Sequence, residues 1–180
     1  MKKITWVIAL LAALALIFVG CPGPGDDDDD NNGGDTDVNL SEIFSATETS
    51  QDKATVTVGK DTMTFTVNGS ELWAELVMPD GTYWDISSYS GFKFEYKTSV
   101  QSTVYLEDNT NTVYVFGWGS FTATDGDWWE KEVSFSTDLE KGWGDGPAAM
   151  DLTKVKKFMV GSTDDSSNNK SFEIRNFEAY

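Results

Sequence analysis

The chain of 180 residues contains no histidine and only one cysteine. Histidine is the commonest general base near neutral pH and the commonest zinc ligand, so its absence excludes Ser-His-Asp catalysis, Cys-His catalysis and HExxH zinc sites. One cysteine cannot form an intramolecular disulfide, so a hydrophobic core must hold the folded part together. Basic residues are also few, 13 against 30 acidic ones, which gives a net charge of −17. This charge argues against binding to nucleic acid and against electrostatic attachment to anionic lipid.

The N-terminus has the pattern of an export signal. Lys2 and Lys3 precede an uncharged apolar run over residues 4–19, which is short for a membrane span and typical of a signal peptide. The run ends in FVGC, and the small residue before the lone Cys21 resembles the lipobox of bacterial lipoproteins, although Phe18 stands where that family usually has an aliphatic residue. The resemblance implies cleavage after residue 20 and lipidation of Cys21. Ordinary secretion is the alternative.

The segment that follows is rich in glycine, proline and aspartate. Residues 21–50 include a run of five aspartates and few apolar side chains, a composition that predicts a disordered acidic tether. Loss of Lys2 and Lys3 with the signal would leave 11 basic against 30 acidic residues, a net charge of −19. We therefore expect a domain held by a lipid anchor in the bacterial cell envelope, facing the periplasm or the cell surface.

Beyond residue 50 the pattern becomes that of short strands separated by turn residues. Alternating or continuous apolar runs predict nine strands, over residues 54–58, 62–67, 72–78, 91–98, 102–108, 112–118, 128–136, 156–162 and 171–179. No segment has a convincing helical period. Nine strands at this spacing indicate an all-β domain over residues 51–180, built as a two-sheet antiparallel β-sandwich.

Three stretches of this domain occur in a familiar order: WDISSYSGFKFEYKT (84–98), DWWEKEVSFSTDL (127–139) and the closing segment 150–180. Together they resemble jelly-roll carbohydrate-binding modules of the galactose-binding-like superfold, especially the family-11 type. The resemblance implies a jelly roll whose concave sheet binds a glucan or another glycan. That family commonly has Ile-Asp-Asn in its last strand, and the aspartate often helps to hold a structural calcium. Here Arg175 takes its place, so calcium is doubtful and no cofactor is expected.

The stretch TVYVFGW (112–118) is apolar on both faces. Strand alternation places Val113 and Val115 on one face and Tyr114, Phe116 and Trp118 on the other. If the valines fill the core, the three rings form an exposed platform on the opposite face. Two other arrangements stay open: the rings lie in the core with the valines outside, or loop residues 119–129 or the segment around residue 143 cover them.

An exposed aromatic face with neighbouring carboxylates suits carbohydrate, because pyranose C–H groups stack on flat rings while polar side chains bond the hydroxyls. Trp128 and Trp129 must point to opposite faces, and Trp129 is expected to be the exposed one. Trp73 and Trp84 are expected to pack in the core or at an edge. The candidate carbohydrate-binding residues are Tyr105, Glu107, Tyr114, Phe116, Trp118, Trp129 and Trp143.

The leading interpretation is a membrane-anchored, monomeric lipoprotein that binds polysaccharide without catalysis and binds no nucleic acid. A protein-interaction or adhesive lipoprotein is the first alternative. A small glycoside hydrolase is the second, and it would need a pair of carboxylates near the aromatic face. The candidates for that pair are Glu107, Asp108, Glu130 and Glu132.

Overall fold

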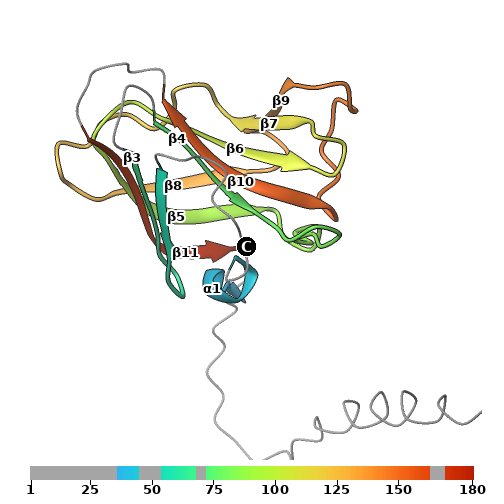
Figure 1. Ribbon diagram of the computed structural model, residues 1–180, viewed down its shortest axis with the longest axis horizontal. Helices are drawn as coiled ribbons and strands as arrows, with labels where there is room; N and C mark the ends of the chain where they lie inside the picture. Colours follow the sequence, from blue (N-terminus) through green and yellow to red (C-terminus); the bar gives the residue numbers. More distant parts are fainter. Residues whose placement is uncertain (1–35, 45–53, 68–71, 163–168) are drawn as a thin grey trace, which may run out of the picture. The chain divides into compact units, whose positions relative to one another are not determined.

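The computed structural model describes residues 36–44, 54–67, 72–162 and 169–180 (Figure 1). The predicted signal peptide, Cys21 and most of the predicted tether lie outside these residues. Among the residues that the structure describes, no helix has the length and apolar composition needed to cross a membrane.

Two antiparallel sheets face each other (Figure 1). The first has the order β2-β3-β11-β5-β8 with β1 also paired to β11, and consists of β1 (Thr36–Asp37), β2 (Ala54–Val58), β3 (Met63–Val67), β5 (Gly91–Thr98), β8 (Trp129–Ser134) and β11 (Lys170–Ala179). The second has the order β4-β10-β6-β7-β9 and consists of β4 (Leu72–Val77), β6 (Thr103–Asp108), β7 (Val113–Phe116), β9 (Leu139–Trp143) and β10 (Val155–Ser162). The predicted all-β sandwich is confirmed.

All nine predicted strands are present, and three further elements were not predicted. These are β1, the short helix α1 (Leu40–Ile43) and β9. Strand β9 carries the sequence LEKGW, whose glycine and charged residues resemble a loop, and it is a strand because it pairs with β7 at the sheet edge.

The segment from Thr36 to Phe44 corrects the predicted boundary of the domain. Leu40 is fully buried, and Phe44 packs edge-on against Trp84 at 5.4 Å between ring centroids. Backbone pairing of β1 with β11 fixes the start of this segment beside the last strand. These residues therefore belong to the folded domain and not to the tether predicted over residues 21–50.

The space between the sheets is filled largely by aromatic rings from alternating strand positions. Strand β5 shows the pattern clearly, because Phe92, Phe94 and Tyr96 are buried while Lys93 and Glu95 are not. Rings from both sheets and their loops meet in the centre at centroid distances of about 5 to 6.5 Å, among them the pairs Trp84–Phe92, Phe94–Phe121 and Phe65–Phe158. Full burial of one such side chain stabilises the fold by roughly 1.5–3 kcal/mol.

The side chains of strand β7 are oriented opposite to the arrangement in which Tyr114, Phe116 and Trp118 form an exposed platform. Phe116 is buried in the core, with ring centroids 6.1 Å from Phe92 and 6.2 Å from Phe135. Tyr114 is buried on the same side, while Val113 and Val115 lie on the outer face. The prediction that Tyr114 and Phe116 form an exposed platform is wrong, and the inverted arrangement holds for these two rings.

The hydroxyl of Tyr114 explains how a polar ring is accommodated inside. Its single O–H donates to the backbone carbonyl of Pro147 at 3.0 Å, with the carbonyl of Ala149 at 3.3 Å and the Asp108 carboxylate at 3.4 Å also in reach, so the buried group is satisfied. Burial, together with the nearby charge of Asp108, raises the pKa of Tyr114 to about 12.

The orientation of β7 predicts that Phe116→Ala and Trp118→Ala change the free energy of unfolding by different amounts. Phe116→Ala should lower the free energy of unfolding by about 3–5 kcal/mol, because it leaves a cavity between the sheets. Trp118→Ala should change it by less than about 1 kcal/mol, because that ring is 59% exposed. Urea unfolding followed by far-UV circular dichroism measures both values. Equal and small effects would contradict the observed side-chain orientation.

Candidate functional site

The outer face of the β4-β10-β6-β7-β9 sheet gathers chemically different side chains into ordered rows. The strand register places three residues side by side in each row, from β4 through β10 to β6: Val77–Lys157–Glu107, Glu75–Met159–Tyr105 and Trp73–Gly161–Thr103. The first two rows thus carry charged side chains next to apolar ones. The third row contains no charged side chain.

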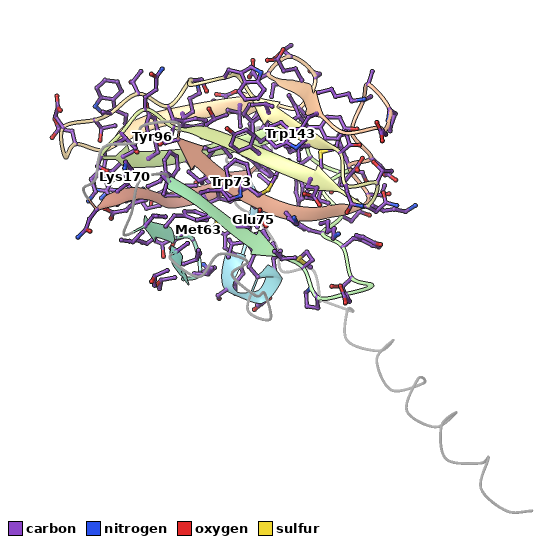
Figure 2. All side chains as sticks on the ribbon, turned by 45° about the horizontal axis from the view of Figure 1, so that its top comes forward. Met63, Trp73, Glu75, Tyr96, Trp143 and Lys170 are labelled. Atoms are coloured by element: carbon purple, nitrogen blue, oxygen red, sulfur yellow. The ribbon has the colours of Figure 1, made fainter. Side chains whose placement is uncertain are left out.

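Four aromatic rings, Trp73, Tyr105, Trp118 and Trp143, form what we call the ring cluster. Figure 2 shows Trp73 on β4 with Trp143 across the sheet from it. The centroid of Trp143 lies 6.2 Å from Trp73, 5.6 Å from Tyr105 and 6.0 Å from Trp118. Tyr105 is buried beneath the others, whereas Trp118 is 59% and Trp143 43% exposed. The cluster therefore presents two large ring surfaces to solvent on an apolar base.

The base of the cluster depends on a glycine in β10. A Cβ at Gly161 would lie 2.7 Å from Cε3 of Trp73 and 3.0 Å from Cε2 of Tyr105, closer than side-chain atoms normally approach. The missing side chain lets both rings lie against the strand backbone, with their centroids 5.3 Å apart. Val113, Val115 and Met159 complete the apolar layer under the rings.

Trp118 sits on a turn that the sequence specifies with two glycines. Gly117 and Gly119 both have positive φ angles, 62° and 61°, a conformation that glycine adopts without strain. The backbone N–H of Gly119 donates to the Thr103 hydroxyl at 2.8 Å, and the Gln101 amide donates to the Gly119 carbonyl at 2.9 Å. These bonds hold the turn that carries Trp118 against the start of β6.

Trp143 is held in a similar way at the end of β9. Gly144 follows it with a φ of 111°, and the next loop residues fold back onto the β6–β7 turn. The N–H of Gly146 donates to the Thr112 hydroxyl at 2.8 Å, and Lys141 donates to the Gly146 carbonyl at 2.7 Å. Trp118 thus lies on a hydrogen-bonded turn, and Trp143 ends a strand just before a hydrogen-bonded loop, so the backbone at both exposed rings is held in place.

An ionic network lies beside the rings. Lys157 binds Glu107 at 3.0 Å and Glu75 at 3.3 Å, and Glu75 also accepts the indole N–H of Trp73 at 2.8 Å. Burial alone would lower the pKa of Lys157, but the hydrogen bonds and charges of both carboxylates outweigh it and raise that pKa above its ordinary value of 10.5. The network therefore orients Trp73 through Glu75 and cancels much of the local charge.

A hollow of about 610 Å³ opens on the other side of Tyr105, where β6 begins and β10 ends. It is lined by Gln101, Thr103, Tyr105, Trp118, Gly119, Gly161 and Ser162. Among the described residues that line it, Tyr105 has the only ionisable side chain. Burial raises the pKa of Tyr105 above its ordinary value, partly offset by a hydrogen bond with Thr103, so these lining residues are uncharged at neutral pH.

The structure brings together four of the seven residues predicted for the site. Tyr105, Trp118 and Trp143 belong to the ring cluster, and Glu107 to the ionic network beside it. Tyr114 and Phe116 are sealed inside the sandwich and cannot touch a ligand. Trp129 is 47% exposed but lies on β8 in the other sheet, against Tyr96.

Trp73 is the residue that the sequence analysis missed. It was expected to pack in the core or at an edge, and β4 is indeed an edge strand of its sheet, but its place on the outer face within the ring cluster was not predicted. The signal was present in LWAELV, because Leu72, Ala74 and Leu76 take the inward positions and leave Trp73 outside. Trp84 is buried in the core, as predicted.

The four candidate carboxylates of the hydrolase alternative do not lie together, and Arg175 occupies the position where the similar modules often have a calcium-binding aspartate. Glu107 and Asp108 lie on β6, but Glu130 and Glu132 lie on β8 in the other sheet, so the four carboxylates are not gathered. Arg175, in the position of the expected aspartate, pairs with Glu95 and lies 4.2 Å from the Trp128 ring centroid. Across the described part of the chain, no group of three or more potential metal ligands occurs.

The ionic network predicts a pH-dependent contribution to stability. Lys157→Met should lower the free energy of unfolding by roughly 1.5–3 kcal/mol at pH 7, because it removes the cation that two nearly buried carboxylates share and leaves only the more distant Lys156 beside Glu107. Because the pKa of Lys157 is raised on folding, this contribution is fully present below pH 10.5 and is lost as pH rises through the folded-state value.

The measurement is urea unfolding of both proteins from pH 7 to 11. Lys154→Met is the matched control, because its ion pair with Asp151 is exposed and should matter little. A difference between wild type and Lys157→Met that is absent at pH 7, or that grows above pH 10.5, would contradict the assignment.

Comparison with family models gives no match for this sequence, and comparison with curated proteins gives none either. Solved structures do share the fold. The family 11 carbohydrate-binding module of a Clostridium thermocellum cellulosomal cellulase has a TM-score of 0.50 at 14% identity, over 74% of this chain and 85% of that one. A variant of the family 29 module CBM29-2 complexed with cellulohexaose has a TM-score of 0.51 at 11% identity, over 81% and 88%. The agarase AgWH50C has a TM-score of 0.50 at 11% identity, over 77% of this chain but only 23% of that protein. The chain therefore has the jelly-roll fold of these carbohydrate-binding modules.

Proposed function

We propose that the outer face of the β4-β10-β6-β7-β9 sheet binds a polysaccharide chain without chemical change to it. The observation that carries this proposal is the ring cluster, in which Trp118 on a hydrogen-bonded turn and Trp143 at the end of β9 present exposed surfaces. Large exposed apolar surfaces on a folded domain usually mark a binding site. Flat rings suit the C–H faces of pyranoses, and the hydroxyl and amide groups of the adjacent hollow suit their hydroxyls.

The fold likeness supports this proposal by analogy alone. The modules that share the fold are named for carbohydrate binding, and one is complexed with cellulohexaose. The argument from this chain's own residues is independent of that likeness, because it rests on ring exposure and on turn geometry. An affinity of about 10⁻³ to 10⁻⁶ M, or about −4 to −8 kcal/mol, is expected for such a shallow surface.

A purely binding role also fits the state of the two carboxylates closest to the rings. Glu75 and Glu107 are both nearly buried, and both are bound by Lys157. Glycoside hydrolysis needs one carboxyl group held as a proton donor and a second in reach of the same sugar. Two carboxylates that share one ammonium group suit a structural role, so we assign them to orienting Trp73 and Lys157 and not to catalysis.

The binding proposal predicts that the exposed tryptophans differ in importance. Trp118→Ala and Trp143→Ala should each weaken binding by at least about tenfold, because each removes a stacking surface. Trp129→Ala is the matched control and should leave the affinity unchanged, since that exposed ring lies on the other sheet. Isothermal titration with cellohexaose, mannohexaose and agarose fragments measures the effect.

Two outcomes would contradict the proposal. Wild-type protein that binds no member of this panel would favour a protein-interaction role for the same face. Equal loss of binding in all three variants would show that the ring cluster is not the binding surface.

We further propose that the domain is held in the bacterial cell envelope by lipid on Cys21, as the sequence pattern around that residue predicts. A lipidated protein should partition into the detergent phase of Triton X-114 and incorporate labelled palmitate. Cys21→Ser should remove both properties and leave the sugar affinity of the domain unchanged. Detergent partitioning that survives this substitution would contradict lipidation at Cys21.

A further inference from the structure

We propose that the hollow beside Trp118 is a subsite for one uncharged sugar unit of the glycan and that it discriminates against a unit carrying a carboxylate. This inference rests on the proposed glycan-binding function and adds a specificity to it. The hollow adjoins the most exposed ring of the cluster, so a chain stacked on Trp118 places its next unit there.

The lining of the hollow supplies hydrogen-bonding groups without charge. The Gln101 amide carries two N–H donors and one acceptor, and it uses one donor for Gly119. The hydroxyls of Thr103 and Ser162 also line the space. Amide and hydroxyl groups match the hydroxyls of a neutral pyranose, which both donate and accept hydrogen bonds.

A carboxylate in this position would lack a positive partner. Of the lining residues that the structure describes, none is a lysine or an arginine. The nearest cation of the same face in the strand register is Lys157, which lies in the row beyond Tyr105 and is bound by Glu75 and Glu107. Transfer of an unpaired charge from water into such a site is unfavourable, and the net charge of −17 adds repulsion.

The walls of the hollow are held in place before binding. Gly119 is fixed from both sides, by its N–H to Thr103 and by its carbonyl to Gln101. Gly161 leaves the floor open, because a side chain there would enter the space taken by Trp73 and Tyr105. A site with fixed walls and uncharged polar groups selects its ligand by the match of hydrogen-bond donors and acceptors. Its walls do not need to rearrange when the ligand binds.

The test compares each neutral oligosaccharide that binds wild type, among cellohexaose, mannohexaose and agarose fragments, with its C6-oxidised, carboxylate-bearing form. Wild type should bind the neutral form at least about tenfold more tightly. Gln101→Leu should weaken neutral binding about five- to tenfold, through loss of one or two hydrogen bonds. Gln101→Lys keeps a donor near Gly119 and adds a cation, so it should reduce the discrimination against the oxidised form by at least about fivefold.

Ser136→Lys is the matched control, because it adds the same charge on the turn between β8 and β9, away from the hollow. If Ser136→Lys improves binding of the oxidised form as much as Gln101→Lys, the discrimination comes from overall charge and the subsite is wrong. If Gln101→Leu binds as wild type while Trp118→Ala does not, the subsite is wrong and the glycan-binding function stands. Wild type that binds no neutral oligosaccharide of the set overturns both.

Discussion

The inward packing of Phe116 is the contact on which the candidate site depends. A strand has two faces, and in β7 the ring of Phe116 is fixed between Phe92 and Phe135 in the core. This leaves Val113 and Val115 on the outer face, where their small side chains form a floor for Tyr105. Larger side chains at those positions would lift the rings above them. The packing of the core and the floor of the ring cluster are therefore two consequences of one side-chain orientation.

Much of the fold could be predicted from the sequence, because alternation and turn residues are local signals. Strand β5 is an example, since its three aromatic residues alternate with charged ones over its whole length. Strand β9 could not be recognised, because its stability comes from pairing with β7 and not from its own composition. The segment around Leu40 and Phe44 was hidden for a similar reason. Its few apolar residues gain their burial from distant strands, which composition alone cannot reveal.

The site was harder to predict than the fold, because both faces of β7 are apolar. Alternation says only that Tyr114 and Phe116 share a side, and the choice of side depends on long-range partners. The carbonyls of Pro147 and Ala149 that satisfy the Tyr114 hydroxyl lie more than thirty residues away in sequence. By contrast, the outward position of Trp73 follows from its own strand, where smaller apolar residues alternate with it. A rule that weighs each tryptophan against its strand neighbours would have found it.

On the outer face, the ring cluster lies beside the ionic network formed by Glu75, Glu107 and Lys157. The protein has a large acidic excess, yet the two buried carboxylates beside the rings are neutralised by lysines, Glu75 by Lys157 and Glu107 by both Lys157 and Lys156. The exposed Glu140 shares the outer face with Val115, because the two residues are paired across β7 and β9. The proposed recognition of a glycan on this face would depend on ring stacking and hydrogen bonds, which act at short range and demand fixed geometry. The surroundings of both exposed tryptophans suit this requirement, because Trp118 lies on a turn with two glycines and Trp143 ends strand β9 just before a loop that is hydrogen-bonded to the β6–β7 turn.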